Sequence, residues 1–86
     1  MNDRQLADKL AALDGKTRTS KRVPGLVVEF TVYGDKVAAT FRRAGAVAVW
    51  DVLPGKAAKV TDLGLDYQAR TAAAHFAAQL AAKLAK

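Results

Sequence analysis

LVVEFTVYGDKVAATF, residues 26–41, alternates apolar and polar side chains on both sides of a central Gly-Asp pair. Such alternation places every second side chain on one face of a β-strand. A two-residue turn at Gly34-Asp35, of the type that takes glycine first, brings the apolar positions of both segments to one face. The expected partners on that face are Val32 with Val37, Phe30 with Ala39, and Val28 with Phe41. A shift of one residue would destroy this agreement, so the stretch predicts a hairpin of defined register, with strands over 26–33 and 36–43.

A third strand is predicted over residues 46–53, after a second tight turn at Ala44-Gly45. With a two-residue loop, Ala48 and Trp50 join the core face, and the opposite face receives Val47, Val49 and Leu53. A loop one residue longer would exchange the two faces. In either case the strand is apolar on both sides. As the last strand of a three-stranded meander it would be an edge, and apolar edges usually need covering.

Helices are predicted at both ends of the chain. Residues 3–14 carry Leu6, Leu10 and Leu13 on one stripe, with Asn2 or Asp3 as the N-cap. Residues 56–65 form a connector, because Gly64 argues against a continuous helix. Asp66 then caps a helix over 67–85. Its expected buried stripe consists of Ala69, Ala73, Phe76, Leu80 and Leu84. Its opposite, wet stripe consists of Gln68, Thr71, His75, Gln79, Lys83 and Lys86.

These elements make residues 1–86 one small α+β domain of order α-β-β-β-α. The expected architecture is a three-stranded antiparallel meander with the helices packed on one face. A chain of this length buries only about 60% of the surface of its unfolded form, so the core is modest. The chain contains no cysteine, which is consistent with a reducing, cytoplasmic location. No uncharged run approaches the ~20 residues of a membrane-spanning helix, so no membrane partner is expected.

A basic loop is predicted over residues 16–22, KTRTSKR, between the first helix and the first strand. It carries four cations, Lys16, Arg18, Lys21 and Arg22, and no acidic residue. The loop therefore accounts for most of the net charge of +6 of the whole chain. Guanidinium, ammonium and hydroxyl groups all donate hydrogen bonds to phosphate oxygens. The segment therefore suits a phosphate-binding loop, and it suits a solvated linker equally well.

Catalysis finds little support in the residue types present. His75 is the only histidine and Ser20 the only serine, and neither has an obvious catalytic partner nearby in the sequence. Asp62 and Asp66 are four residues apart, but hard cations usually recruit more than two oxygen ligands. We therefore expect no enzyme, no catalytic residue, no metal and no cofactor. No small-molecule substrate is evident.

Two hypotheses of function remain. The first is a small basic protein that binds the phosphates of DNA or RNA without strong sequence specificity, through the four loop cations, with Arg42 and Arg43 as secondary contacts. The second is a protein-interaction module, most simply a homodimer, that uses Val47, Val49 and Leu53 of the third strand. The two hypotheses are compatible, because a dimer would present twice the charge to a nucleic acid.

Overall fold

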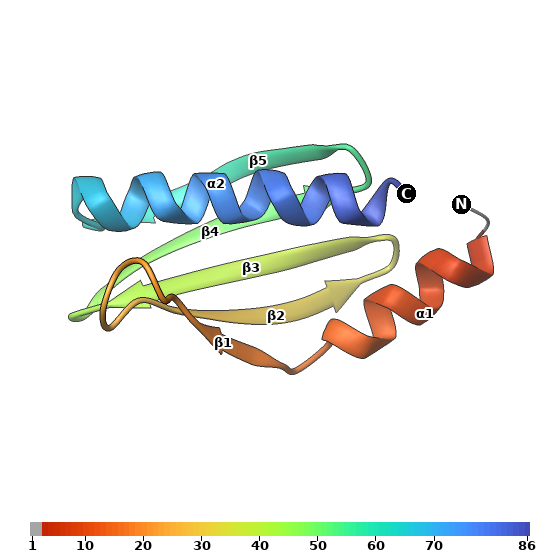
Figure 1. Ribbon diagram of the computed structural model, residues 1–86, viewed down its shortest axis with the longest axis horizontal. Helices are drawn as coiled ribbons and strands as arrows, with labels where there is room; N and C mark the ends of the chain where they lie inside the picture. The colour runs from red at the N-terminus through yellow and green to blue at the C-terminus, as the bar shows by residue number, and fades with distance from the viewer. Residues whose placement is uncertain (1–2) are drawn as a thin grey trace.

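The computed structural model describes the backbone of residues 3–86 and the side chains from Arg4 onward (Figure 1). Five strands form one antiparallel sheet in the order β1-β2-β3-β4-β5, flanked by a helix at each end of the chain. The strands are β1 (Thr17–Thr19), β2 (Val27–Tyr33), β3 (Lys36–Arg43), β4 (Ala46–Leu53) and β5 (Lys56–Leu63), and the helices are α1 (Asp3–Leu13) and α2 (Tyr67–Leu84). The architecture is a single α+β domain with a C-terminal helix packed on the sheet. The predicted N-cap of α1, Asn2 or Asp3, lies outside the described side chains.

The predicted first hairpin is confirmed in its register. Val32 pairs with Val37, Phe30 with Ala39, and Val28 with Phe41. The side chains of Val28, Phe30 and Phe41 are buried on the face toward α2, whereas Glu29 lies opposite Thr40 on the other face. Gly34 has a φ of 60°, as a turn that takes glycine first requires.

Of the two loop lengths that the sequence allowed, the second hairpin adopts the two-residue loop. Ala44 and Gly45 both have positive φ, 51° and 85°, the signature of a type I′ turn. Ala48 therefore pairs with Phe41 and Trp50 with Ala39 on the core face. The opposite, solvent-facing side of the sheet, which we call the open face, receives Val47, Val49 and Leu53.

The prediction of three strands is wrong, because the sheet has five. Residues 56–63, predicted as part of a connector, form strand β5, which pairs with β4 along its length. Pro54-Gly55 ends β4 and also forms the turn into β5. Proline at the first and a positive-φ glycine (80°) at the second turn position make it a tight turn that returns the chain beside β4. A register shift between Val49 and Trp50 marks a bulge in the β4–β5 pairing. Strand β4 is consequently interior and not the edge that was predicted.

The remaining strand of the sheet, β1, lies inside the predicted basic loop. Thr17, Arg18 and Thr19 pair with Glu29, Val28 and Val27 as strand β1. The amide groups flanking this strand continue the ladder, since Phe30 N donates to Lys16 O at 3.0 Å and Gly15 N donates to Phe30 O at 2.9 Å.

The first helix ends at Leu13. Asp14 lies beyond the helix, and its Oδ1 accepts from the Val32 amide at 3.0 Å.

The core lies between the sheet and α2, which packs chiefly on β4 and β5 and reaches β3. Buried alanines recur along the helix at positions 69, 73 and 77, and Ala39 and Ala48 are buried in the sheet. The first helix contacts β2 and contributes Leu10 to the core. Lys9 Nζ donates to the backbone oxygens of Lys83 and Lys86, at 3.0 and 3.1 Å, which fixes α1 to the end of α2. Neither described helix is long and apolar enough to cross a bilayer.

Candidate anion-binding groove

A cavity of about 330 Å³ opens between the basic segment and α2. The helix lies over the β4–β5 half of the sheet, so the core face of β1 and β2 extends beside the helix and is not fully covered by it (Figure 1). A second cavity of about 330 Å³ continues toward α1 and includes Leu13, Leu80 and Lys83 in its lining. Arg18, Phe76 and Gln79 line both cavities, so we treat them as one feature, the basic groove.

The floor of the basic groove is apolar and aromatic. In the first cavity it consists of Leu26, Val28, Phe41 and Phe76. The Phe76 ring stacks on Phe30 with centroids 5.9 Å apart and meets Phe41 edge-on at 5.8 Å. Phe76 is only partly buried. Two aromatic contacts therefore hold in place a ring whose remaining surface borders the groove.

The rim of the groove carries cations from the basic segment. Arg18 lies opposite the buried Val28 in the β1–β2 register, so alternation directs it to the α2 side of the sheet. Lys21 and Arg22 follow on the turn between β1 and β2. Lys83 of α2 lines the second cavity. No acidic residue lines either cavity, as far as the described chain extends.

Hydrogen bonds give the turn that carries Lys21 and Arg22 a defined shape. The Ser20 hydroxyl accepts from the amides of Arg22 and Val23, at 3.2 and 3.0 Å. Ser20 N in turn donates to Leu26 O at 2.9 Å, and the buried Val23 anchors the turn in the core. The segment is therefore an ordered turn, and the side chains of Lys21 and Arg22 remain exposed on it.

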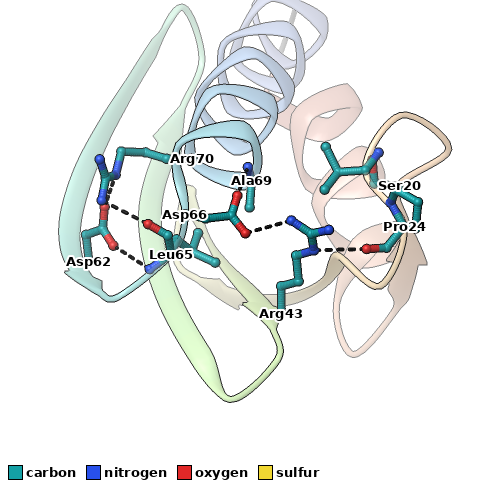
Figure 2. Close-up of polar contacts among 9 residues, drawn as sticks. Ser20, Pro24, Arg43, Asp62, Leu65, Asp66, Ala69 and Arg70 are labelled. Carbon is teal, nitrogen blue, oxygen red and sulfur yellow. Dashed lines mark hydrogen bonds and ion pairs between the residues drawn. The ribbon is translucent and has the colours of Figure 1, made fainter.

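Arg43 connects this turn to the start of α2 (Figure 2). Its Nε donates to Pro24 O at 3.0 Å, and its Nη1 forms an ion pair of 2.6 Å with Asp66 Oδ2. Asp66 is the predicted N-cap, and its Oδ1 accepts from the Ala69 amide at 2.8 Å. That backbone hydrogen bond and the Arg43 guanidinium hold the pKa of Asp66 below its ordinary value of 3.8. We call this set of contacts the Arg43 clamp, because it joins the turn between β1 and β2 to the N-cap of α2.

Asp62 is held in a neighbouring cluster of contacts, also drawn in Figure 2. Its carboxylate pairs with Arg70 and, at 3.6 Å, with Lys59, and it accepts from the Leu65 amide at 3.2 Å. Partial burial raises the pKa of Asp62, but these hydrogen bonds and charges outweigh burial and leave it below its ordinary value. Asp62 and Asp66 thus face cationic partners. Among the described residues, no group of three or more histidine, aspartate or glutamate side chains is placed to hold a metal ion.

The structure separates the six cations predicted to bind phosphate. Arg18, Lys21 and Arg22 meet at the groove, and the described contacts give none of them an acidic partner. Lys16 is exposed just before β1 and does not line the groove. Arg42 lies on the open face in an ion pair of 3.4 Å with Glu29, across the sheet from the groove. Arg43 lies beside the basic turn, but the Arg43 clamp occupies its guanidinium.

The three predicted interface residues lie together on the open face. Val47, Val49 and Leu53 are partly buried, and they alternate along β4 with Ala48, Trp50 and Val52, which belong to the core on the other face. Val47 lies between Arg42 and Leu63 in the register, and Leu63 is 65% exposed. Tyr33 and Val27 of β2 add further exposed apolar surface.

Sequence reasoning missed the contribution of α2 to the groove. His75 and Gln79 line the first cavity, and Lys83 lines the second. All three belong to the wet stripe predicted for this helix. The fourfold spacing of these polar residues was the available signal, but only the position of β1 beside the helix shows that the stripe borders a cavity.

No protein-family model matches this chain, and neither a curated protein nor a solved structure does.

Proposed function

We propose that this protein is a non-enzymatic nucleic-acid-binding protein that holds the phosphates of DNA or RNA at the basic groove. Recognition is of charge and shape, without strong sequence specificity, because phosphate contacts carry no base information. The primary contacts are Arg18, Lys21 and Arg22. Lys83, which lines the second cavity, extends the cationic surface, and Lys16 adds a further charge just before β1.

The distribution of ion pairs is the observation that supports this proposal most. Lys36, Arg42, Arg43, Lys59 and Arg70 each have a carboxylate partner in the described structure. Arg18, Lys21 and Arg22 have none; Arg18 belongs to β1, and Lys21 and Arg22 lie on the turn whose shape is fixed by Ser20. Cations scattered only for solubility would not need to gather at a cavity without acidic residues. An anion at the rim would supply the missing counter-charge.

Replacing Arg18, Lys21 and Arg22 together with glutamine should weaken nucleic-acid binding and flatten its salt dependence. The magnitude of the negative slope of log K against log salt concentration decreases by about 0.7 per lost single-strand contact, or about 0.9 per lost duplex contact. Three lost contacts therefore reduce it by about 2 to 3. Fluorescence anisotropy with a labelled oligonucleotide, measured from about 50 mM salt upward, gives both quantities.

The matched control is the variant Arg4→Gln/Lys56→Gln/Lys86→Gln. It also lowers the net charge from +6 by three units, at exposed positions that do not line the groove. We expect it to keep most of the wild-type slope. Equal losses in the two variants would show that net charge alone drives association. Absence of wild-type binding at about 50 mM salt would refute the proposal.

The open face favours a second candidate function, self-association with a second copy of this chain. Val47, Val49 and Leu53 lie on the face of the sheet opposite the buried Ala48, Trp50 and Val52. The charged side chains around them are paired within the same face, Glu29 with Arg42 and Lys36 with Asp51, both at 3.4 Å. A second copy would therefore meet apolar strips flanked by neutralised pairs, without strong like-charge repulsion.

The substitution Val49→Asp should abolish that association, because it places an unpaired charge in the centre of the contact. Sedimentation at high micromolar concentration gives the mass of the particle, and far-UV circular dichroism verifies folding. The control Ala74→Asp introduces the same charge on the exposed side of α2. A wild-type protein that sediments as a monomer under these conditions would exclude the homodimer.

A further inference from the structure

We infer that the first cavity of the basic groove receives one unstacked base of a single strand, while the cations at its rim hold the adjoining phosphates. This inference rests on the proposed function and narrows its partner to unpaired nucleic acid. A phosphate-binding site needs only the cationic rim. The apolar, aromatic floor beneath that rim calls for an additional explanation.

The cavity presents the two components that single-strand binding combines. Sites of this kind join a cationic surface along the backbone with an aromatic side chain that contacts a base. Here Arg18, Lys21 and Arg22 supply the charge, and Phe76 supplies the aromatic surface. The aromatic contacts of Phe76 with Phe30 and Phe41 fix the ring before any ligand arrives.

The dimensions of the cavity agree with a ligand moiety of this kind. A volume of about 330 Å³ lies at the lower end of the range of small-molecule sites, which start at about 300 Å³. Ser20, His75 and Gln79 also line the cavity, and their polar groups are available to the edge of a base. A duplex keeps its bases stacked and paired and could engage only the rim.

The charge of the lining distinguishes this occupant from others. Every ionisable residue that lines the cavity is basic, so the ligand should be an anion with an apolar or aromatic portion. A strand of nucleic acid meets both demands with a repeating unit, since each base is flanked by phosphates. The base-stacking contribution is tolerant of sequence, because every base has a π-face.

The substitution Ala72→Leu tests the inference without removing charge. Ala72 lines the first cavity from α2, so a leucine there fills the space while the helix is retained. The control is Ala78→Leu, the same change at an exposed position of α2 that lines neither cavity. Two probes are compared by anisotropy: an oligothymidylate of about ten nucleotides and an abasic strand of the same length and charge.

Wild-type protein and the Ala78→Leu control should bind the oligothymidylate about fivefold to a hundredfold more tightly than the abasic strand. This ratio corresponds to the contribution of about 1–3 kcal/mol per stacked base. The Ala72→Leu variant should lose the difference and bind the abasic strand as wild type does. Octyl phosphate in excess should leave the bound oligothymidylate in place.

Equal wild-type affinity for the two strands would overturn the base-insertion inference and leave phosphate binding standing. Displacement of the oligothymidylate by octyl phosphate from wild type would identify an alkyl-chain site and also overturn it. Failure to bind either strand at about 50 mM salt would instead refute the proposed function itself. The two proposals therefore fail in different ways.

Discussion

Replacing Phe41 with alanine is expected to lower the free energy of unfolding by about 3–5 kcal/mol. Phe41 is only 2% exposed, and its ring meets those of Trp50 and Phe76 edge-on. The ring centroids are 5.5 Å apart for Trp50 and 5.8 Å apart for Phe76. Its removal deletes buried area and two aromatic contacts, and it leaves a cavity that the rigid β3 ladder cannot close. Small domains have total stabilities of about 5–15 kcal/mol, so much of the native stability would be lost.

Urea denaturation followed by circular dichroism measures this change. The control is Tyr33→Ala, which removes an aromatic ring that is 56% exposed on the open face. Only strand propensity opposes that substitution, so its effect should not exceed about 1 kcal/mol. Comparable losses in the two variants would mean that the aromatic cluster around Phe41 does not organise the core.

Replacing Ala73 with leucine is expected to destabilise the fold by about 1–3 kcal/mol, although leucine is larger and more apolar. Ala73 is fully buried in the face of α2 that packs on the sheet, between Ala69 and Ala77. Buried alanines on the sheet, Ala39 and Ala48, allow the helix to approach closely. Three added carbon atoms would force the helix away from its contacts on β4 and β5.

Ala74→Leu provides the comparison, because Ala74 is the next residue of α2 and is exposed. Both substitutions have nearly the same helix propensity, so only the packing of the side chain differs. We expect Ala74→Leu to change the free energy of unfolding by less than about 0.5 kcal/mol. A stabilised Ala73→Leu protein would show that unfilled space remains between α2 and the sheet.

The two central hairpins could be predicted from sequence because their signals agree with one another. Alternation between Leu26 and Phe41 selects the core face, and Gly34-Asp35 selects the register. For the second hairpin, alternation left two possibilities, and the positive φ of Ala44 and Gly45 corresponds to the shorter loop. The final helix was equally accessible, since Asp66 is a strong N-cap and the leucines and alanines recur with helical spacing.

The two outer strands escaped prediction because their stabilisation comes from neighbours. Strand β1 consists of three exposed residues with no apolar side chain. It exists because the backbone groups of β2 offer hydrogen-bond partners at that edge. Strand β5 has a weak pattern, KAAKVTDL, and a bulge interrupts its alternation. The turn at Pro54-Gly55 was the accessible sign, because proline followed by glycine also suits a hairpin.

Only part of the candidate site could be derived from sequence. The charge of residues 16–22 is visible there, but the cavity beside it depends on where α2 crosses the sheet. Arg42 and Arg43 are neighbours in sequence and lie in different environments, because successive strand residues alternate between faces. Their ion pairs with Glu29 and Asp66 arise from cross-strand and tertiary contacts that local pattern does not encode.

The bulge in the β4–β5 pairing also determines how copies of this protein can meet. Beyond it, β5 presents lysines at positions 56 and 59, and the opposite border of the sheet is the three-residue strand β1. Short strands, bulges and lysines all discourage the addition of a foreign strand to a sheet. Lateral growth into a continuous intermolecular sheet is therefore disfavoured at both borders. The protein can carry an uncovered apolar face in solution without also offering its neighbours an edge from which a fibril could grow.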